Sequence, residues 1–252
     1  MYMFSINIEQ NRQCYLEHIK RQMLYAVNTA RGTQNIVNCD ERSFLEIYVD
    51  NEYRDKIEFG LKNNIAEVIA LGFKADYLSE KLKFTDDSLL NRTLVNTMSI
   101  FDNEIDKKMA LNGLNGLEAL SLDGYFQFKL KALKNRWDEI INVTNKNGMI
   151  SYNDYIKIEF LQYLMQSIPT LVNYVRLDMT LYGFVLYDST NRELNTIPLM
   201  KCFPIDKEEE LLYNLICLSP KSVCITGDDN CLSEQFVNLF NSLFNDVKPE
   251  NY

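Results

Sequence analysis

Two adjacent carboxylates offer the most enzyme-like chemistry in the sequence. Asp228 and Asp229 lie in the loop 227–230, after a short apolar strand and before an amphipathic helix. Mg²⁺ favours a few oxygen ligands and keeps several waters, so two carboxylates at the carboxyl end of a strand could hold this ion. The alternative is a turn that offers negative charge to the dipole of the following helix. We favour the turn, because a phosphate-binding loop needs more glycine and usually a lysine.

A cysteine and a histidine lie four residues apart on a predicted helix. Cys14 and His18, the only histidine, could share a metal ion or form a nucleophile and base pair. Neither chemistry has its remaining partners in the sequence. We therefore favour helix residues without a role in chemistry.

Six cysteines are scattered through the chain: Cys14, Cys39, Cys202, Cys217, Cys224 and Cys231. The last three are spaced by seven, but the predicted elements place one at a helix end, one in a strand and one in a loop. Since paired short spacings are missing, we predict no zinc site and no other cofactor. No signal sequence and no run of 18 apolar residues is seen, so we expect a cytoplasmic protein without a membrane span, with all six thiols reduced.

Four cations gather on one face of a predicted central helix over residues 121–141. They are Lys129, Lys131, Lys134 and Arg136, in a chain whose net charge is -9. This charge argues against a chain-wide nucleic-acid surface, because phosphate binding relies on clustered cations. A solvated helix face is the simplest interpretation. An acidic protein partner or a local phosphate contact remains open.

Hydrophobic periodicity predicts an α+β fold. The first fifty residues indicate a small β-α-β part, with strands at 4–8 and 44–49 and a helix at 16–30. A helical period begins at residue 53 and continues for about a hundred residues. Asn112 and the two glycines that follow punctuate this region, so we divide the chain into regions 1–112 and 113–252, which can also form one compact domain.

The C-terminal third changes period after Pro169. Runs at 171–178 and 181–188 predict a hairpin, and a short third strand is possible at 193–197. A helix to Leu218, a strand at 221–226 and a final helix at 233–244 complete a β-β-α-β-α part.

Two stretches resemble the YtxC-like sporulation proteins of endospore-forming Firmicutes. LDGYFQFKLKAL at 122–133 is similar to the family's polar residue, glycine, aromatic and F-x-L pattern. GFVLYD at 183–188, LICLSPKSVCITG at 215–227 and QFVNLFNSLFNDV at 235–247 look like its ending. The match covers roughly residues 120–250 and departs at 131–135, where family members tend to be more acidic. It implies a cytoplasmic sporulation protein with no established activity and no catalytic residues to carry over.

The sequence therefore predicts a non-catalytic protein that acts by binding another protein. The first alternative is a metal-dependent, phosphate-handling enzyme that uses Asp228 and Asp229. The second is a nucleic-acid binder that uses the helix face from Lys129 to Arg136. The lack of catalytic motifs favours the binding protein over the enzyme, and the net charge of -9 favours it over the nucleic-acid binder.

Overall fold

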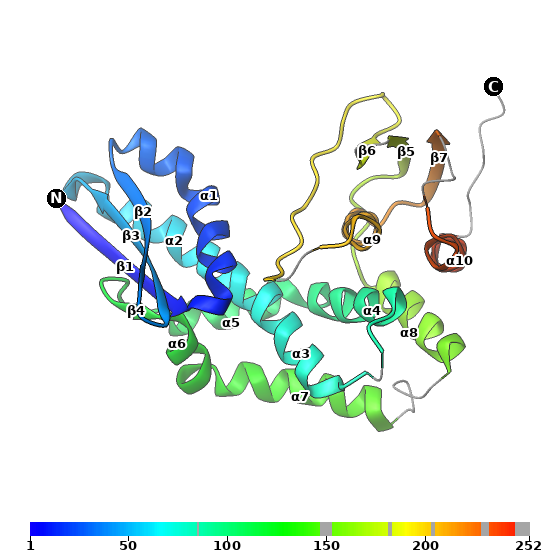
Figure 1. The fold of residues 1–252 in the computed structure, drawn as a ribbon, viewed down its shortest axis with the longest axis horizontal. Coiled ribbons are helices and arrows are strands. Elements are labelled where there is room, and N and C mark those ends of the chain that lie inside the picture. Colours follow the sequence, from blue (N-terminus) through cyan, green and yellow to red (C-terminus); the bar gives the residue numbers. More distant parts are fainter. Residues whose placement is uncertain (85, 147–152, 181–182, 203–204, 228–231, 245–252) are drawn as a thin grey trace. The chain divides into compact units, whose positions relative to one another are not determined.

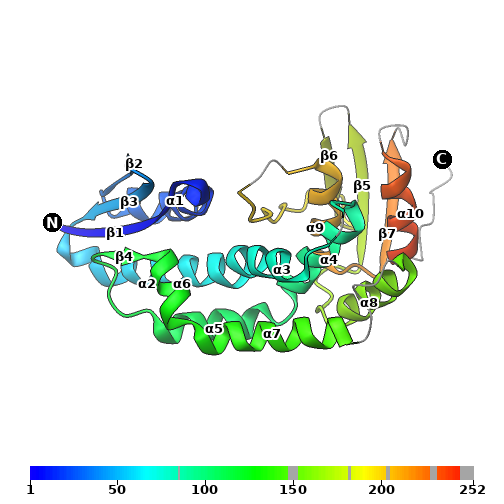
Figure 2. The ribbon, with the colours of Figure 1, turned by 60° about the horizontal axis from the view of Figure 1, so that its bottom comes forward.

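The computed structural model describes residues 1–84, 86–146, 153–180, 183–202, 205–227 and 232–244. It confirms the predicted α+β fold. The chain forms two compact units, each built from segments that are distant in sequence. The first contains residues 1–77, 102–140 and 200–204, and the second contains residues 78–101, 141–199 and 205–252. Figures 1 and 2 show the elements of both units in two views.

A four-stranded sheet with the order β2-β3-β1-β4 forms the base of the first unit. Its members are β1 (Tyr2–Glu9), β2 (Thr33–Cys39), β3 (Arg42–Val49) and β4 (Leu120–Ser121). β1 and β2 are antiparallel to β3, and β4 is parallel to β1. Alternate residues of β1 and β3 are fully or almost fully buried, because one face of the sheet packs on the core.

Helix α1 (Gln13–Thr29) packs on this sheet and also contacts α2 (Arg54–Val68). Leu16, Ile19, Met23 and Val27 form its buried stripe, as the helical period predicted. Short 3₁₀ turns at Gln10–Arg12 and Asn51–Tyr53 join these helices to the preceding strands. The predicted β-α-β part is therefore confirmed, and β2 extends it to β-α-β-β.

A π-helical segment, Ile69–Phe73, joins α2 to α3 (Lys74–Leu82). Within it, Gly72 lies against the ring of Tyr15, where an added Cβ would stand 2.5 Å from Cε1. Only glycine permits this approach without displacement of the ring. The ring of Tyr15 in turn stacks on Phe73, with 5.3 Å between centroids, so the segment anchors α1 to the helices below the sheet.

Two predicted long helices are each broken into two. The run through residues 90–109 is α4 (Leu89–Ile100) and α5 (Asn103–Gly113), separated by Asp102 in the left-handed region at φ 57°. The central helix is α6 (Leu122–Lys129) and α7 (Lys131–Lys146), separated at Leu130. Leu130 is nevertheless buried, so the apolar spacing continues across a break that periodicity alone does not reveal.

The second unit contains a three-stranded sheet with the order β6-β5-β7. β5 (Tyr174–Thr180) and β6 (Gly183–Tyr187) form the predicted hairpin, and β7 (Ser222–Gly227) runs parallel to β5. The possible third strand is reduced to one bridge between Tyr187 and Glu193. With the helices α9 (Lys207–Leu218) and α10 (Glu234–Leu243), these strands give the predicted β-β-α-β-α order. Helix α8 (Asp154–Gln166) and α9 both pack against α4.

Candidate functional site

A groove of about 460 Å³ runs between α1 and β2 in the first unit. One wall is formed by α1, and the floor is the side of β2 that faces this helix. Its lining consists of Gln13, Glu17, Lys20, Arg21 and Leu24 from α1 and of Gln34, Ile36 and Asn38 from β2. Leu24 is 49% exposed and Ile36 only partly buried, so α1 leaves this margin of the sheet uncovered.

β2 is an edge strand, because it pairs only with β3 in the part of the chain that the structure describes. The β2–β3 hairpin closes with Cys39 opposite Arg42 around the two-residue turn Asp40–Glu41. In a hairpin of this length the closing pair is hydrogen-bonded, and hydrogen-bonded pairs then alternate along the ladder. The amide N–H and C=O groups of Gln34, Ile36 and Asn38 therefore point away from β3, toward the open edge.

The same three residues direct their side chains toward α1. Gln34 lies opposite Ile47 and Ile36 opposite Leu45, and both of these β3 residues are fully buried on the face that α1 covers. Gln34 confirms this orientation, since its Nε2 donates a 2.9 Å hydrogen bond to the carbonyl oxygen of Lys20. Its Oε1 is buried and accepts no hydrogen bond from the described residues.

Three charged residues line the groove, two cations (Lys20 and Arg21) and one carboxylate (Glu17), so its lining has a net charge of +1. Neither cation takes part in an ion pair of the described residues. The nearest acidic group on the same helix, Glu17, accepts a 2.8 Å hydrogen bond from Gln13. The two cations outnumber the single carboxylate of the lining in a chain of net charge -9, and this local excess of positive charge favours an acidic ligand.

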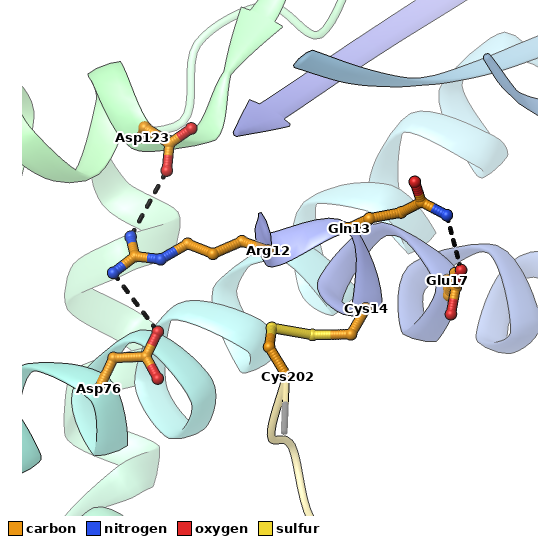
Figure 3. Close-up of a disulfide and its surroundings, with 7 residues drawn as sticks. All are labelled: Arg12, Gln13, Cys14, Glu17, Asp76, Asp123 and Cys202. Atoms are coloured by element: carbon orange, nitrogen blue, oxygen red, sulfur yellow. Dashed lines mark hydrogen bonds and ion pairs between the residues drawn. A yellow bond between two sulfur atoms is a disulfide. The ribbon is translucent and has the colours of Figure 1, made fainter. Parts of the chain in front are cut away.

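A disulfide joins Cys14, near the start of α1, to Cys202, which also belongs to the first unit. Their Cα atoms lie 5.3 Å apart although 188 positions separate them in sequence. The expectation that all six thiols are reduced was therefore wrong for this pair, because sequence distance gives no indication of such a contact. Figure 3 shows the bond beside Arg12, whose guanidinium pairs with Asp123 and Asp76 at 3.5 Å each.

The Cys14 and His18 pair is not a catalytic pair. Cys14 is bonded to Cys202, and the Nδ1 of His18 lies 3.4 Å from Arg21. His18 is buried, and its Nε2 forms no hydrogen bond with a described residue. Burial, helped by the charge of Arg21, lowers the pKa of His18 below its usual 6.5. His18 is therefore a neutral core residue near neutral pH.

The four cations of the predicted basic face differ in their surroundings. Lys129 ends α6, and Lys131 starts α7; both are exposed. Lys134 donates a 2.8 Å hydrogen bond to the carbonyl oxygen of Gln127, and Arg136 pairs with Asp102 and, at 3.2 Å, with Asp106. The break at Leu130 and these internal contacts divide the face, which leaves two exposed lysines as a possible contact surface.

Arg136 belongs instead to a buried charge cluster. Lys74 and Asp106 are both 0% exposed, and the Nζ of Lys74 lies 2.6 Å from the Oδ2 of Asp106. The indole Nε1 of Trp137 donates a 3.0 Å hydrogen bond to the same oxygen. Burial lowers the pKa of Lys74, although the charge of Asp106 acts in the opposite direction. Because no atom of this pair reaches the surface, we interpret the cluster as a structural element of the first unit.

The other candidates from the sequence are the two adjacent carboxylates and the remaining cysteines. Asp228, Asp229 and Cys231 lie outside the described residues. Cys217 and Cys224 are free thiols in α9 and β7, and burial raises the pKa of Cys217 to about 12. Among the described residues, no group of three or more histidine, cysteine or acidic side chains is arranged to hold a metal ion.

The groove is the feature that sequence reasoning missed. The sequence predicts only a turn or a weak strand at 35–40, whereas the structure forms the regular strand β2 over Thr33–Cys39. The available signal was the pair of cations on α1, because the helical period places Lys20 at the margin of the buried stripe and Arg21 on the exposed side.

Comparison with models of known protein families, with curated proteins and with solved structures finds no match. The described helices include none that is both long enough and apolar enough to span a bilayer.

Proposed function

We propose that the chain is a non-catalytic protein that acts by binding another protein through the groove between α1 and β2. One observation carries the proposal: an open edge strand lies beside a groove in which two cations outnumber the single carboxylate. Open strand edges are ready templates for pairing, and soluble proteins usually cover or blunt them. The other edge of the same sheet, β4, is blunted in this way, since it has only two residues.

The cellular setting comes from the sequence. The resemblance to YtxC-like proteins supports a role in the sporulation programme and the cytoplasmic location that this family implies. The nucleic-acid alternative loses support because Lys134 and Arg136 are engaged within the protein.

Affinity capture after mild crosslinking tests the proposal. The tagged protein is compared with a variant carrying Lys20→Glu and Arg21→Glu, in cells sampled during sporulation. Lys56→Glu is the matched control, because Lys56 is an exposed cation of α2 that lies outside the groove. A partner captured by the wild type and the control but not by the double variant supports the proposal. A partner retained equally by all three proteins contradicts it.

A further inference from the structure

We propose that the groove binds an extended, acidic segment of the partner protein, which adds to the sheet as a strand beside β2. This inference rests on the proposed function and specifies how the site recognises its ligand. The sheet would then have five strands, with the partner segment about 4.8 Å from β2.

The backbone supplies the first part of the argument. Gln34, Ile36 and Asn38 present three N–H and three C=O groups along the open edge, at the spacing of every second residue. An extended segment satisfies such groups by main-chain pairing, whereas a helix cannot, because its own backbone groups are already bonded. The floor of the groove therefore selects an extended ligand.

The side chains supply the second part. Alternate residues of an added strand point toward α1 and enter the groove, where Leu24 and Ile36 offer partly exposed apolar surface. The carboxylates of such a segment can reach Lys20 and Arg21. These contacts fit a segment in which every second residue faces α1 and these inward-facing residues include both acidic and β-branched side chains.

Hydrophobic burial is only a secondary contribution here. Gln34 and Asn38 flank Ile36 on the floor, so the apolar area is small and main-chain pairing with electrostatic attraction must supply much of the affinity. Since Lys20 and Arg21 are accessible to solvent, the affinity should fall as salt rises.

Random twelve-residue peptides displayed on phage provide the probe for the intact protein. We expect selected sequences to be rich in aspartate, glutamate and β-branched residues and to lack proline. A synthetic consensus peptide is then titrated with the wild-type protein in fluorescence anisotropy. The Lys20→Glu and Arg21→Glu double variant should bind about tenfold more weakly, since each exposed ion pair contributes a factor of up to about five. The Lys56→Glu control should bind as the wild type does.

Backbone pairing is tested from both partners. Asn38→Pro removes one outward N–H without removing a β2–β3 ladder bond, whereas Asn38→Ala keeps this N–H. We expect binding to weaken about tenfold in the proline variant and to stay within about twofold in the alanine variant. N-methylation of single amides along the peptide leaves the fold of the protein untouched. It should weaken binding at every second position and have little effect between them.

The outcomes separate the two proposals. Peptides that bind with no period of two in the N-methyl series overturn strand addition, and so does selection of basic or helical peptides. Binding of a single-stranded oligonucleotide that depends on Lys20 and Arg21 overturns an acidic peptide as the ligand. The proposed function survives either result if capture of a protein partner still depends on the groove.

Discussion

Replacement of Asp106 by asparagine should destabilise the first unit severely. The substitution keeps the size of the side chain but removes the negative charge that faces Lys74 at 2.6 Å. It also weakens the acceptor for the indole N–H of Trp137 and for Arg136. Each of these donors was desolvated on folding, so the change leaves buried positive charge poorly compensated.

The size of the expected loss in unfolding free energy follows from the burial of Lys74 and Asp106. Both side chains are 0% exposed, and breaking a buried ion pair by removing one partner typically costs about 3 to 5 kcal/mol. For a chain of this size, each kcal/mol corresponds to about 2 to 4 °C in the midpoint of thermal unfolding. We therefore expect a fall of about 6 to 20 °C. Replacing Lys74 as well, in the double variant Lys74→Met with Asp106→Asn, should cost less than Asp106→Asn alone, because the buried ammonium is removed and the asparagine oxygen can still accept from Trp137.

Urea unfolding followed by tryptophan fluorescence provides the assay. Trp137 is the only tryptophan and is 0% exposed, so its emission reports on the first unit itself. Glu139→Gln is a suitable control, because Glu139 is an exposed acidic residue of the same helix. A loss below about 1 kcal/mol for Asp106→Asn, or a double variant less stable than the single one, would refute this account of the cluster.

The remaining predictions concern the histidine and the cysteines. Since the folded state keeps His18 neutral and the unfolded chain takes up a proton below pH 6.5, stability should fall as pH decreases through 6.5. His18→Gln should show a shallower fall in urea titrations at pH 7.5 and 5.5, and equal slopes would contradict the assignment. Cys202→Ser should lower the free energy of unfolding by about 2 to 5 kcal/mol, because the disulfide closes a loop of 188 positions. Reducing agent should abolish the difference from wild type, and a difference that persists would point to another cause. Iodoacetamide at pH 8 should modify the exposed Cys39 well before Cys217, whose pKa is raised to about 12; peptide mass spectrometry showing the reverse order would contradict this assignment of burial.

Periodicity was sufficient where a segment has one clear buried face. β1, α1 and the C-terminal β-β-α-β-α part follow from apolar residues at spacings of two or of three and four. Helix breaks were not predictable in this way. At Leu130 the apolar stripe continues through the break, and at Asp102 the interruption is one left-handed residue rather than glycine or proline.

Contacts between residues distant in sequence were the second feature that the sequence did not predict. A fully buried lysine such as Lys74 looks like a surface residue in sequence, because its counter-charge Asp106 is 32 positions away. The same applies to Cys14 and Cys202 and to the two units, whose segments alternate along the chain. The groove depends on which margin of a sheet α1 leaves uncovered, which strand order determines and local pattern does not.

Site-specific photocrosslinking in living cells tests the central claim most directly. Leu24, which lines the groove, is replaced by the photoreactive residue benzoylphenylalanine, and Phe59 of α2 is replaced in a parallel strain. Phe59 is 71% exposed and lies outside the groove. It is therefore an exposed apolar residue like Leu24, at a position where the groove cannot contribute to crosslinking. The account predicts a discrete, light-dependent protein adduct from position 24 and none of the same mass from position 59. The same adduct from both positions, or from position 59 alone, would contradict binding through the groove.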